Sequence, residues 1–244
     1  MHKPRSKDLY GGRDPREIPA YRTTDAALYL RVPENTIRAW AFGRSYPGVH
    51  AVRRVTPVVA AADPERHLLS FVNMLEIHVL DAIRRYHHVD MRRIRAAVEY
   101  LEEQFGSEHP LIDHAMETDG VDVFVRKWGS LINASRQGQL GMKVLLDSYL
   151  RRIERDERGL AIRLFPFARK RGAERLAEHE MEQYPRIVMM DPRIAFGRPV
   201  IAGTGIPTAE IADRFNAGES ITDLARDYER APAEIEEAIR CEAA

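Results

Sequence analysis

The fold of this chain depends on the stretch GTGIPTAEIADRFNAGESITDLARDYERAPAEIEEAIR, residues 203–240. Thr208 is placed to cap a first helix, and Gly218 ends that helix because glycine readily takes a positive φ. Ser220 caps a second helix, and Pro232 occupies the natural first position of a third. The apolar residues that recur three and four apart, and so predict the buried faces, are Ile211, Phe215, Ile221, Leu224, Ala225, Tyr228, Ile235, Ala238 and Ile239. The stretch therefore predicts a three-helix unit shaped like a helix-turn-helix.

A short β-structure is expected just before these helices. Residues 187–190 are all apolar, and Asp191-Pro192 stops the run. Turns at Gly197 and Gly203 follow. We therefore place a C-terminal domain at residues 185–244, after a charged linker at 172–184.

The same region carries a family resemblance. The string DPRIAFGRPVIAGTGIPTAEI (191–211), followed by NAGESITDLARDY (216–228), resembles domain of unknown function family 433, which VapB-type antitoxins carry. The sequence departs from that family at Gly205, where an arginine is common. The resemblance implies an antitoxin whose partner is a PIN-type ribonuclease toxin.

A second helix-turn-helix is predicted near the other end of the chain. The string YRTTDAALYLRVPENTIRAW (21–40) places Thr24 as the cap of a first helix and turns Ile37 and Trp40 of a second helix into the core. This string resembles the reading head of MerR-type regulators, whose second helix enters the major groove. That family usually has glycine where this chain has Arg31, so a left-handed conformation is expected there.

The outward face of this second helix supplies the candidates for DNA recognition. Arg38 suits guanine or a phosphate, and Asn35 suits adenine. Arginines also flank an apolar alternation after the helix, which predicts a β-wing that runs to His67-Leu68-Leu69. The predicted DNA-binding residues are Thr24, Asn35, Thr36, Arg38, Arg44, Arg53 and Arg54. The resemblance continues to residue 105 and adds Arg92, Arg93 and Arg95 as secondary phosphate contacts.

The two ends of the chain differ in charge. Residues 1–60 hold 11 Lys/Arg and 5 Asp/Glu, a net charge of +6, whereas residues 172–244 hold 8 and 15, a net charge of −7. A basic end suits a polyanion, and an acidic end suits a basic protein. Ordinary solvated faces would also explain the asymmetry. Residues 1–20, which are polar and contain three prolines, are expected to form a flexible arm.

The acidic C-terminal domain is the expected toxin-binding region. A ribonuclease presents a basic groove to RNA, which carboxylates can occupy, while apolar anchors supply affinity. The candidate contact residues are Phe196, Ile206, Glu234 and Glu237. The glutamates of the last helix would face phosphates in a groove, so this second helix-turn-helix shape is not expected to bind DNA.

Residues 106–171 are expected to form a small α/β segment. Apolar runs at 121–125 and 131–133 predict two strands joined by a turn. A helix is expected over 140–153, and another strand over 161–165.

No catalytic chemistry is indicated. The chain has no HExxH or GxSxG motif, and its glycine-rich stretches lack a phosphate-loop lysine, so we expect no enzyme and no cofactor. His87 and His88 are adjacent on a predicted helix and point about 100 degrees apart, so a metal site there is not expected. The single cysteine, Cys241, cannot form an internal disulfide.

The sequence thus predicts a mainly α protein with small β elements. Its expected parts are an arm (1–20), a winged helix-turn-helix (21–105), a central segment (106–171) and the C-terminal domain. No membrane span or signal peptide is predicted, so a cytoplasmic location is expected. Two functions remain open: an autorepressing antitoxin that binds operator DNA as a homodimer and neutralises a PIN-type toxin, or a MerR-like regulator with a C-terminal sensing or oligomerisation domain and no toxin.

Overall fold

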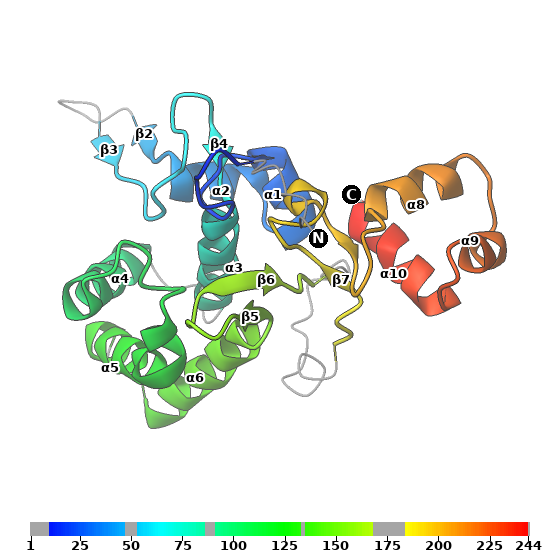
Figure 1. Ribbon diagram of the computed structural model, residues 1–244. Helices are drawn as coiled ribbons and strands as arrows, with labels where there is room; N and C mark the ends of the chain where they lie inside the picture. Colours follow the sequence, from blue (N-terminus) through cyan, green and yellow to red (C-terminus); the bar gives the residue numbers. More distant parts are fainter. Residues whose placement is uncertain (1–9, 47–52, 86–90, 133–134, 168–183, 244) are drawn as a thin grey trace, which may run out of the picture.

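The computed structural model describes residues 10–46, 53–85, 91–132, 135–167 and 184–243. Most of the described residues lie in helices, and the strands form small antiparallel pairs, as the sequence predicts (Figure 1). The N-terminal part contains β1 (Tyr21–Arg22), α1 (Thr23–Leu30), α2 (Glu34–Ala41), β2 (Arg44–Tyr46), β3 (Arg53–Val55), β4 (Leu68–Leu69) and α3 (Phe71–Arg85).

The helix-turn-helix of α1 and α2 forms where the sequence places it. Arg31 takes the left-handed conformation, with φ 56°, and Ile37 and Trp40 are buried. The prediction that Thr24 caps α1 is wrong. The helix already begins at Thr23, and the Asp25 carboxylate accepts a hydrogen bond from the backbone N–H of Arg22 at 2.8 Å, which satisfies that end of the helix.

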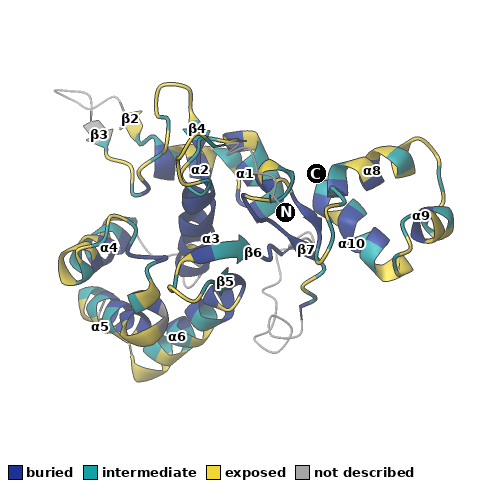
Figure 2. Cartoon of the chain, viewed as in Figure 1, coloured by how far each residue is buried: buried dark blue, intermediate teal, exposed yellow. Residues whose placement is uncertain are grey.

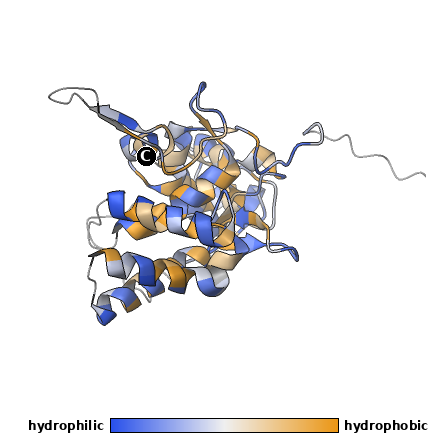
Figure 3. Cartoon of the chain, turned by 90° about the vertical axis from the view of Figure 1, so that its left-hand side faces the viewer, coloured by the Kyte–Doolittle hydropathy of each residue, from blue (hydrophilic) through white to orange (hydrophobic). Residues whose placement is uncertain are grey.

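The wing is shorter than the sequence suggests. β2 pairs with β3, with Arg44 opposite Val55, and the hairpin projects from the body of the molecule (Figures 1 and 3). Leu68 and Leu69 were expected to end the wing, but they pair with Arg22 and Tyr21 in the β1–β4 ladder. This difference follows from burial, because Leu69 is an internal residue of the core.

Residues 10–20 are not the free arm that their composition predicts. The backbone N–H of Val72 donates to the Arg16 carbonyl at 3.1 Å, and that of Ala20 donates to the Leu69 carbonyl at 2.9 Å. Backbone pairing therefore holds this segment against β4 and α3, although it has few apolar side chains. The remaining part of the expected arm, residues 1–9, lies outside the described residues, as do His87 and His88.

Helix α3 lies at the centre of the molecule and is buried over nearly its whole described length (Figure 2). It packs against α6, and α4 packs against α5. The elements that follow α3 are α4 (Met91–Phe105), η1 (Met116–Gly120), α5 (Val121–Ile132) and α6 (Arg136–Leu150), and then the antiparallel strands β5 (Ile153–Arg155) and β6 (Ala161–Leu164).

The strands predicted at 121–125 and from 131 are wrong, because α5 is a helix that runs to Ile132, and residue 133 lies outside the described residues. The buried residues of α5 recur at helical spacing, and they are Val121, Phe124, Val125 and Trp128. The β-branched valines favoured a strand, but the buried face that they complete has the period of a helix. The next predicted helix begins at Arg136 rather than 140, and Ile153 belongs to a strand, whereas the strand predicted over 161–165 is present as β6.

The C-terminal part forms the predicted short strands and three helices: β7 (Val188–Met189), η2 (Ala195–Gly197), β8 (Val200–Ile201), α8 (Thr208–Asn216), α9 (Ile221–Asp227) and α10 (Pro232–Glu242). Gly218 has φ 104°, and the hydroxyl of Ser220 accepts from the Asp223 N–H as a cap. Thr208 is not a cap. It is buried in the first turn, where its hydroxyl donates to the Pro199 carbonyl at 3.2 Å.

The C-terminal part is attached to the rest through its strands and through α10. Met190 bridges to Leu164 and belongs to the large core, and the phenolic O–H of Tyr21 donates to the Gly197 carbonyl at 2.9 Å. In Figure 1, α10 lies beside α1, while α8 and α9 extend away from the body. The three helices have a separate small core around Ile235.

Candidate nucleic-acid interface

The outer face of α2 carries an exposed arginine, Arg38, beside Glu34 of the first turn of the helix. Ile37 and Trp40 turn inward, which leaves Asn35 and Arg38 on the outer face. The side chain of Arg38 is 47% exposed, and its Nη1 lies 3.8 Å from the Glu34 carboxylate. An exposed pair at that distance is weak, so Arg38 remains available to a ligand.

Two further arginines reach this turn from other elements. Arg44 of β2 donates from Nη2 to the Asn35 carbonyl at 2.7 Å, and Arg84 of α3 donates from Nη1 to the Thr36 hydroxyl at 2.6 Å. The Arg84 guanidinium also lies 5.8 Å from the centre of the Trp40 ring. Both acceptors are neutral, so these hydrogen bonds hold the two guanidinium groups in place without neutralising their charge.

The other predicted DNA-binding residues divide into three groups. Thr24 is exposed in the first turn of α1, and Thr36 is half-buried with its hydroxyl engaged by Arg84. Arg53 and Arg54 lie on β3 of the wing, opposite Tyr46 and Ser45. The secondary candidates Arg92, Arg93 and Arg95 lie on α4, which packs against α5.

Arg84 is a candidate for this interface that the sequence analysis missed. It lies 48 residues from Thr36 along the chain, so no local spacing relates the two. The available signal was its place at the exposed end of a helix that is buried over the rest of its described length. An arginine at the exposed end of a buried helix is most often only solvated.

The C-terminal glutamates do not form the exposed acidic face that the sequence predicts. Glu237 is 2% exposed and accepts from Arg240 at 3.0 Å, so it points into the molecule. Glu234 accepts from the Ala231 N–H at 2.9 Å and pairs with Arg230, which makes it a capping residue of α10. Both prefer these positions because a helix N-terminal turn and nearby guanidinium groups stabilise carboxylates.

The two apolar candidates for toxin binding, Phe196 and Ile206, differ in their exposure to solvent. Phe196 is 68% exposed and lies in a left-handed turn with φ 55°, between exposed Arg193 and Arg198. Ile206 is half-buried and packs against the core of the three helices. Of the two, only Phe196 is therefore largely exposed to solvent.

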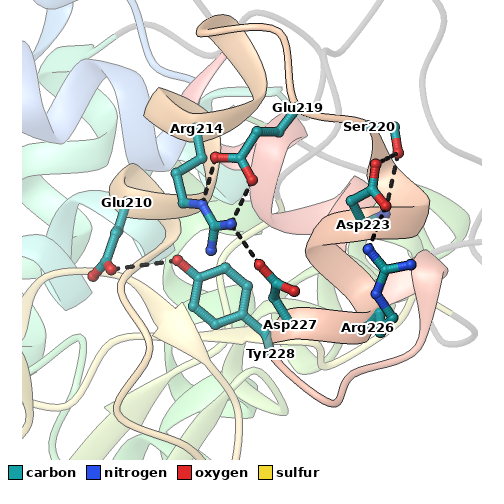
Figure 4. Close-up of polar contacts among 8 residues, drawn as sticks. All are labelled: Glu210, Arg214, Glu219, Ser220, Asp223, Arg226, Asp227 and Tyr228. Atoms are coloured by element: carbon teal, nitrogen blue, oxygen red, sulfur yellow. Dashed lines mark hydrogen bonds and ion pairs between the residues drawn. The ribbon is translucent and has the colours of Figure 1, made fainter.

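The arginines of α8 to α10 are used within the fold, as Figure 4 shows for Arg214. Its Nε donates to Glu219 at 2.7 Å, its Nη2 donates to Asp227 at 2.8 Å, and its guanidinium lies 5.1 Å from the centre of the Tyr228 ring. These hydrogen bonds raise the pKa of Arg214 and lower that of Glu219. Each arginine between residues 208 and 242 has a carboxylate partner, and these are Arg214, Arg226, Arg230 and Arg240.

The part of the chain that the structure describes holds no group of three or more His, Cys, Asp or Glu side chains arranged to bind a metal. Burial raises the pKa of Cys241 to about 12, so its thiol stays protonated at neutral pH. Among the same residues, no helix is both long enough and apolar enough to span a bilayer.

Comparison with known proteins also divides the chain into an N-terminal and a C-terminal region. Residues 19–98 match the family "Putative DNA-binding HTH domain", and residues 188–240 match "Protein of unknown function (DUF433)". The chain is 29% identical over 241 residues to "Putative antitoxin VapB45" of Mycobacterium tuberculosis, an alignment that covers 91% of this chain and 93% of that protein. The crystal structure of Rv2018 from Mycobacterium tuberculosis has the same fold, with a TM-score of 0.63 and 24% identity over 91% of this chain and 98% of that one. The chain therefore joins an N-terminal region that matches the family described as a putative DNA-binding HTH domain to a C-terminal region that matches DUF433, and it is similar over nearly its whole length to a protein named as a putative VapB antitoxin.

Proposed function

We propose that this protein is an antitoxin that binds its own operator through α2 and the wing and neutralises a PIN-type ribonuclease toxin. The observation that carries the DNA-binding part is the meeting of Arg38, Arg44 and Arg84 at the first turn of α2. A recognition helix places its N-terminal residues against base edges, and surrounding cations contact the phosphates. Groove-reading heads of this kind usually act as symmetric dimers, so we include a homodimer in the proposal.

Replacing Arg38 by alanine tests the DNA-binding part. If Arg38 reads a base, Arg38→Ala costs about 1 to 3 kcal/mol at the operator, whereas Arg54→Ala weakens all sequences alike. Binding is measured by fluorescence anisotropy on duplexes from the region upstream of the gene, at several salt concentrations. Arg226→Ala is a matched control, because Arg226 is also exposed, at 72%, but pairs with Asp223 in the C-terminal domain. Parent-like affinity of the Arg38 variant at every salt concentration contradicts the assignment of α2.

The toxin-binding part rests on the similarity to a protein named as an antitoxin and on two features of the C-terminal domain. Its described residues from 201 to 242 carry 10 Asp/Glu and 4 Arg, which suits a basic partner. Phe196 offers an exposed aromatic anchor, and aromatic residues are common at the centres of protein interfaces. Glu234 and Glu237 are no longer among the proposed contacts, because the fold uses both.

Coexpression with an adjacent reading frame of the PIN type tests this part. Phe196→Asp should reduce copurification of the toxin and protection of the cells, while Leu140→Asp should not. Leu140 is a suitable control because it is similarly exposed, at 63%, on α6. Deleting the whole C-terminal domain, by ending the chain at Arg171, is a less specific test of toxin binding. That deletion also removes the carbonyls of Tyr184 and Pro185, which accept hydrogen bonds from the buried Arg152. If no toxin copurifies with the parent while operator binding persists, the MerR-like regulator without a toxin is the better description.

A further inference from the structure

Arg31 occupies the turn between the two helices of the reading head. Its backbone is left-handed, with φ 56° and ψ 35°, a conformation that glycine adopts without the steric cost that a Cβ brings. This chain has an arginine in this unfavourable conformation. The contacts of its side chain supply a reason.

The guanidinium of Arg31 caps the C-terminal end of α10. Nη1 donates to the Ala243 carbonyl at 2.6 Å, and Nη2 donates to the carbonyls of Arg240 and Cys241 at 2.5 Å and 3.0 Å. The last carbonyls of a helix have no partners within the helix, and a cation near them is favourable for the helix dipole. One side chain of the head thus satisfies the last turn of the C-terminal domain, more than 200 residues away.

The surrounding contacts place this cap in a continuous interface between α1 and the C-terminal domain. Tyr29 of α1 packs against a small buried cluster that contains Val188 and Cys241. Just before the other end of α1, Tyr21 of β1 donates to the Gly197 carbonyl. Helix α1 is therefore held at both ends by the C-terminal domain, and Arg31 joins that held helix directly to α2.

We propose that Arg31 is a positioning residue for DNA recognition: by binding the carbonyls at the end of α10, it holds the α1–α2 turn in the geometry that presents α2 to the groove. The C-terminal domain then forms part of the reading head rather than an independent appendage. This inference rests on the proposed DNA-binding function. Arg31 acts through the turn and is not itself a phosphate contact, since its guanidinium faces α10.

Arg31→Gly separates the backbone role from the side-chain role. Glycine tolerates the left-handed turn, so a purely conformational role for residue 31 predicts unchanged or improved binding. The cap predicts the opposite: affinity for the operator falls by roughly tenfold, within the range usual for coupled sites. Arg31→Lys keeps the charge but lacks the planar fork that reaches several carbonyls, so an intermediate loss is expected.

Two readouts distinguish positioning from other effects in the full-length chain. A lost phosphate contact lowers the slope of log affinity against log salt concentration by about 0.9, whereas loss of positioning leaves the slope unchanged. Loss of positioning also lowers the affinity for the operator more than the affinity for an unrelated duplex. Partial unfolding of the protein lowers both affinities equally. Circular dichroism melts report the folded fraction of each variant.

Removing residues 243–244 tests the other side of the same contact, because it deletes the acceptor of Nη1. The deletion should weaken operator binding in the parent by less than Arg31→Gly does, because the carbonyls of Arg240 and Cys241 remain. It should have little further effect in the Arg31→Gly background, where the guanidinium is already absent. Parent-like operator binding by Arg31→Gly, or equal losses on operator and unrelated DNA, overturns the inference. If the parent itself binds no DNA, the proposed function fails first, and that outcome is read directly from the parent.

Discussion

The molecule contains two units shaped like helix-turn-helices, and arginines packed beside them have different partners. Beside α1 and α2, Arg44 of β2 and Arg84 of α3 are held by neutral oxygens in the first turn of α2. In α8 to α10, Arg214 instead bonds two carboxylates and lies against an aromatic ring. A similar shape therefore presents cations to a ligand in one unit and neutralises them in the other.

This difference shows why shape alone is a poor guide to nucleic-acid binding. Both units arise from the same local devices, namely caps, tight turns and apolar stripes. The affinity of a protein for DNA depends mainly on cations that remain available to phosphates. Whether a guanidinium is available is decided by the groups that the fold places beside it.

The largest expected effect concerns the separate core of the C-terminal unit. Ile235 is fully buried in a cluster distinct from the large core, so Ile235→Ala should lower the free energy of unfolding of α8 to α10 by about 2 to 5 kcal/mol. Both tryptophans, Trp40 and Trp128, lie in the large core, so fluorescence follows the rest of the molecule and circular dichroism follows all helices. Urea unfolding should show an earlier transition by circular dichroism. Coincident transitions in the variant would mean that the two regions unfold as one.

Removing the arginines that are held by neutral oxygens should affect DNA binding next most strongly. If both contact phosphates, Arg44→Ala with Arg84→Ala lowers the salt slope by about 1.8 and weakens all duplexes. The matched control is Arg214→Ala with Arg226→Ala, which removes the same charge from the C-terminal unit. Equal losses in the two double variants, measured by anisotropy over a salt series, would remove the distinction between the units.

A smaller effect is expected at the cap of α9. The Ser220 hydroxyl accepts from the Asp223 N–H at 3.1 Å, so Ser220→Ala should cost about 1 kcal/mol of stability. DNA affinity should stay at the parent value, because this helix lies outside the proposed interface. Thermal unfolding measures the first quantity and anisotropy the second, and a clear loss of DNA binding would show that α9 takes part in recognition.

The smallest effect is a dependence of stability on pH in the large core. Nδ1 of His109 lies 3.0 Å from the buried Glu76 carboxylate, which raises the pKa of His109, while burial raises the pKa of Glu76. A raised folded pKa means that the stabilisation is complete below the ordinary histidine value of 6.5 and is lost as pH rises through the raised value. The free energy of unfolding should fall over that window, and His109→Gln should remove this part of the fall.

Glu219→Gln is the control for the pH experiment. The hydrogen bond from Arg214 lowers the pKa of Glu219, so this exposed carboxyl changes charge only in acid. Its replacement should leave the profile near neutral pH like that of the parent. A histidine variant whose profile equals that of the parent would show that the buried pair does not titrate in this range.

Much of the fold follows from the sequence because its signals act over one helical turn. Gly218, Ser220 and Pro232 delimit the last three helices at the positions expected of them. Arg31 takes the left-handed conformation expected from its place in the turn. The error in α5 was also local, since its apolar residues already had helical spacing and the preference of valine for strands was given too much weight.

The sequence by itself determined the two helix-turn-helix shapes, the starts of the last two helices at Ser220 and Pro232, and the opposite charge of the two ends. Only the tertiary structure decided that Arg84 meets Thr36, that Glu237 is buried and that Arg31 reaches the end of α10. The physical reason is distance along the chain. Helix caps and apolar stripes depend on residues at most four apart in the sequence. The charge that a side chain presents depends instead on its partners, which packing brings together from elements tens to hundreds of residues apart.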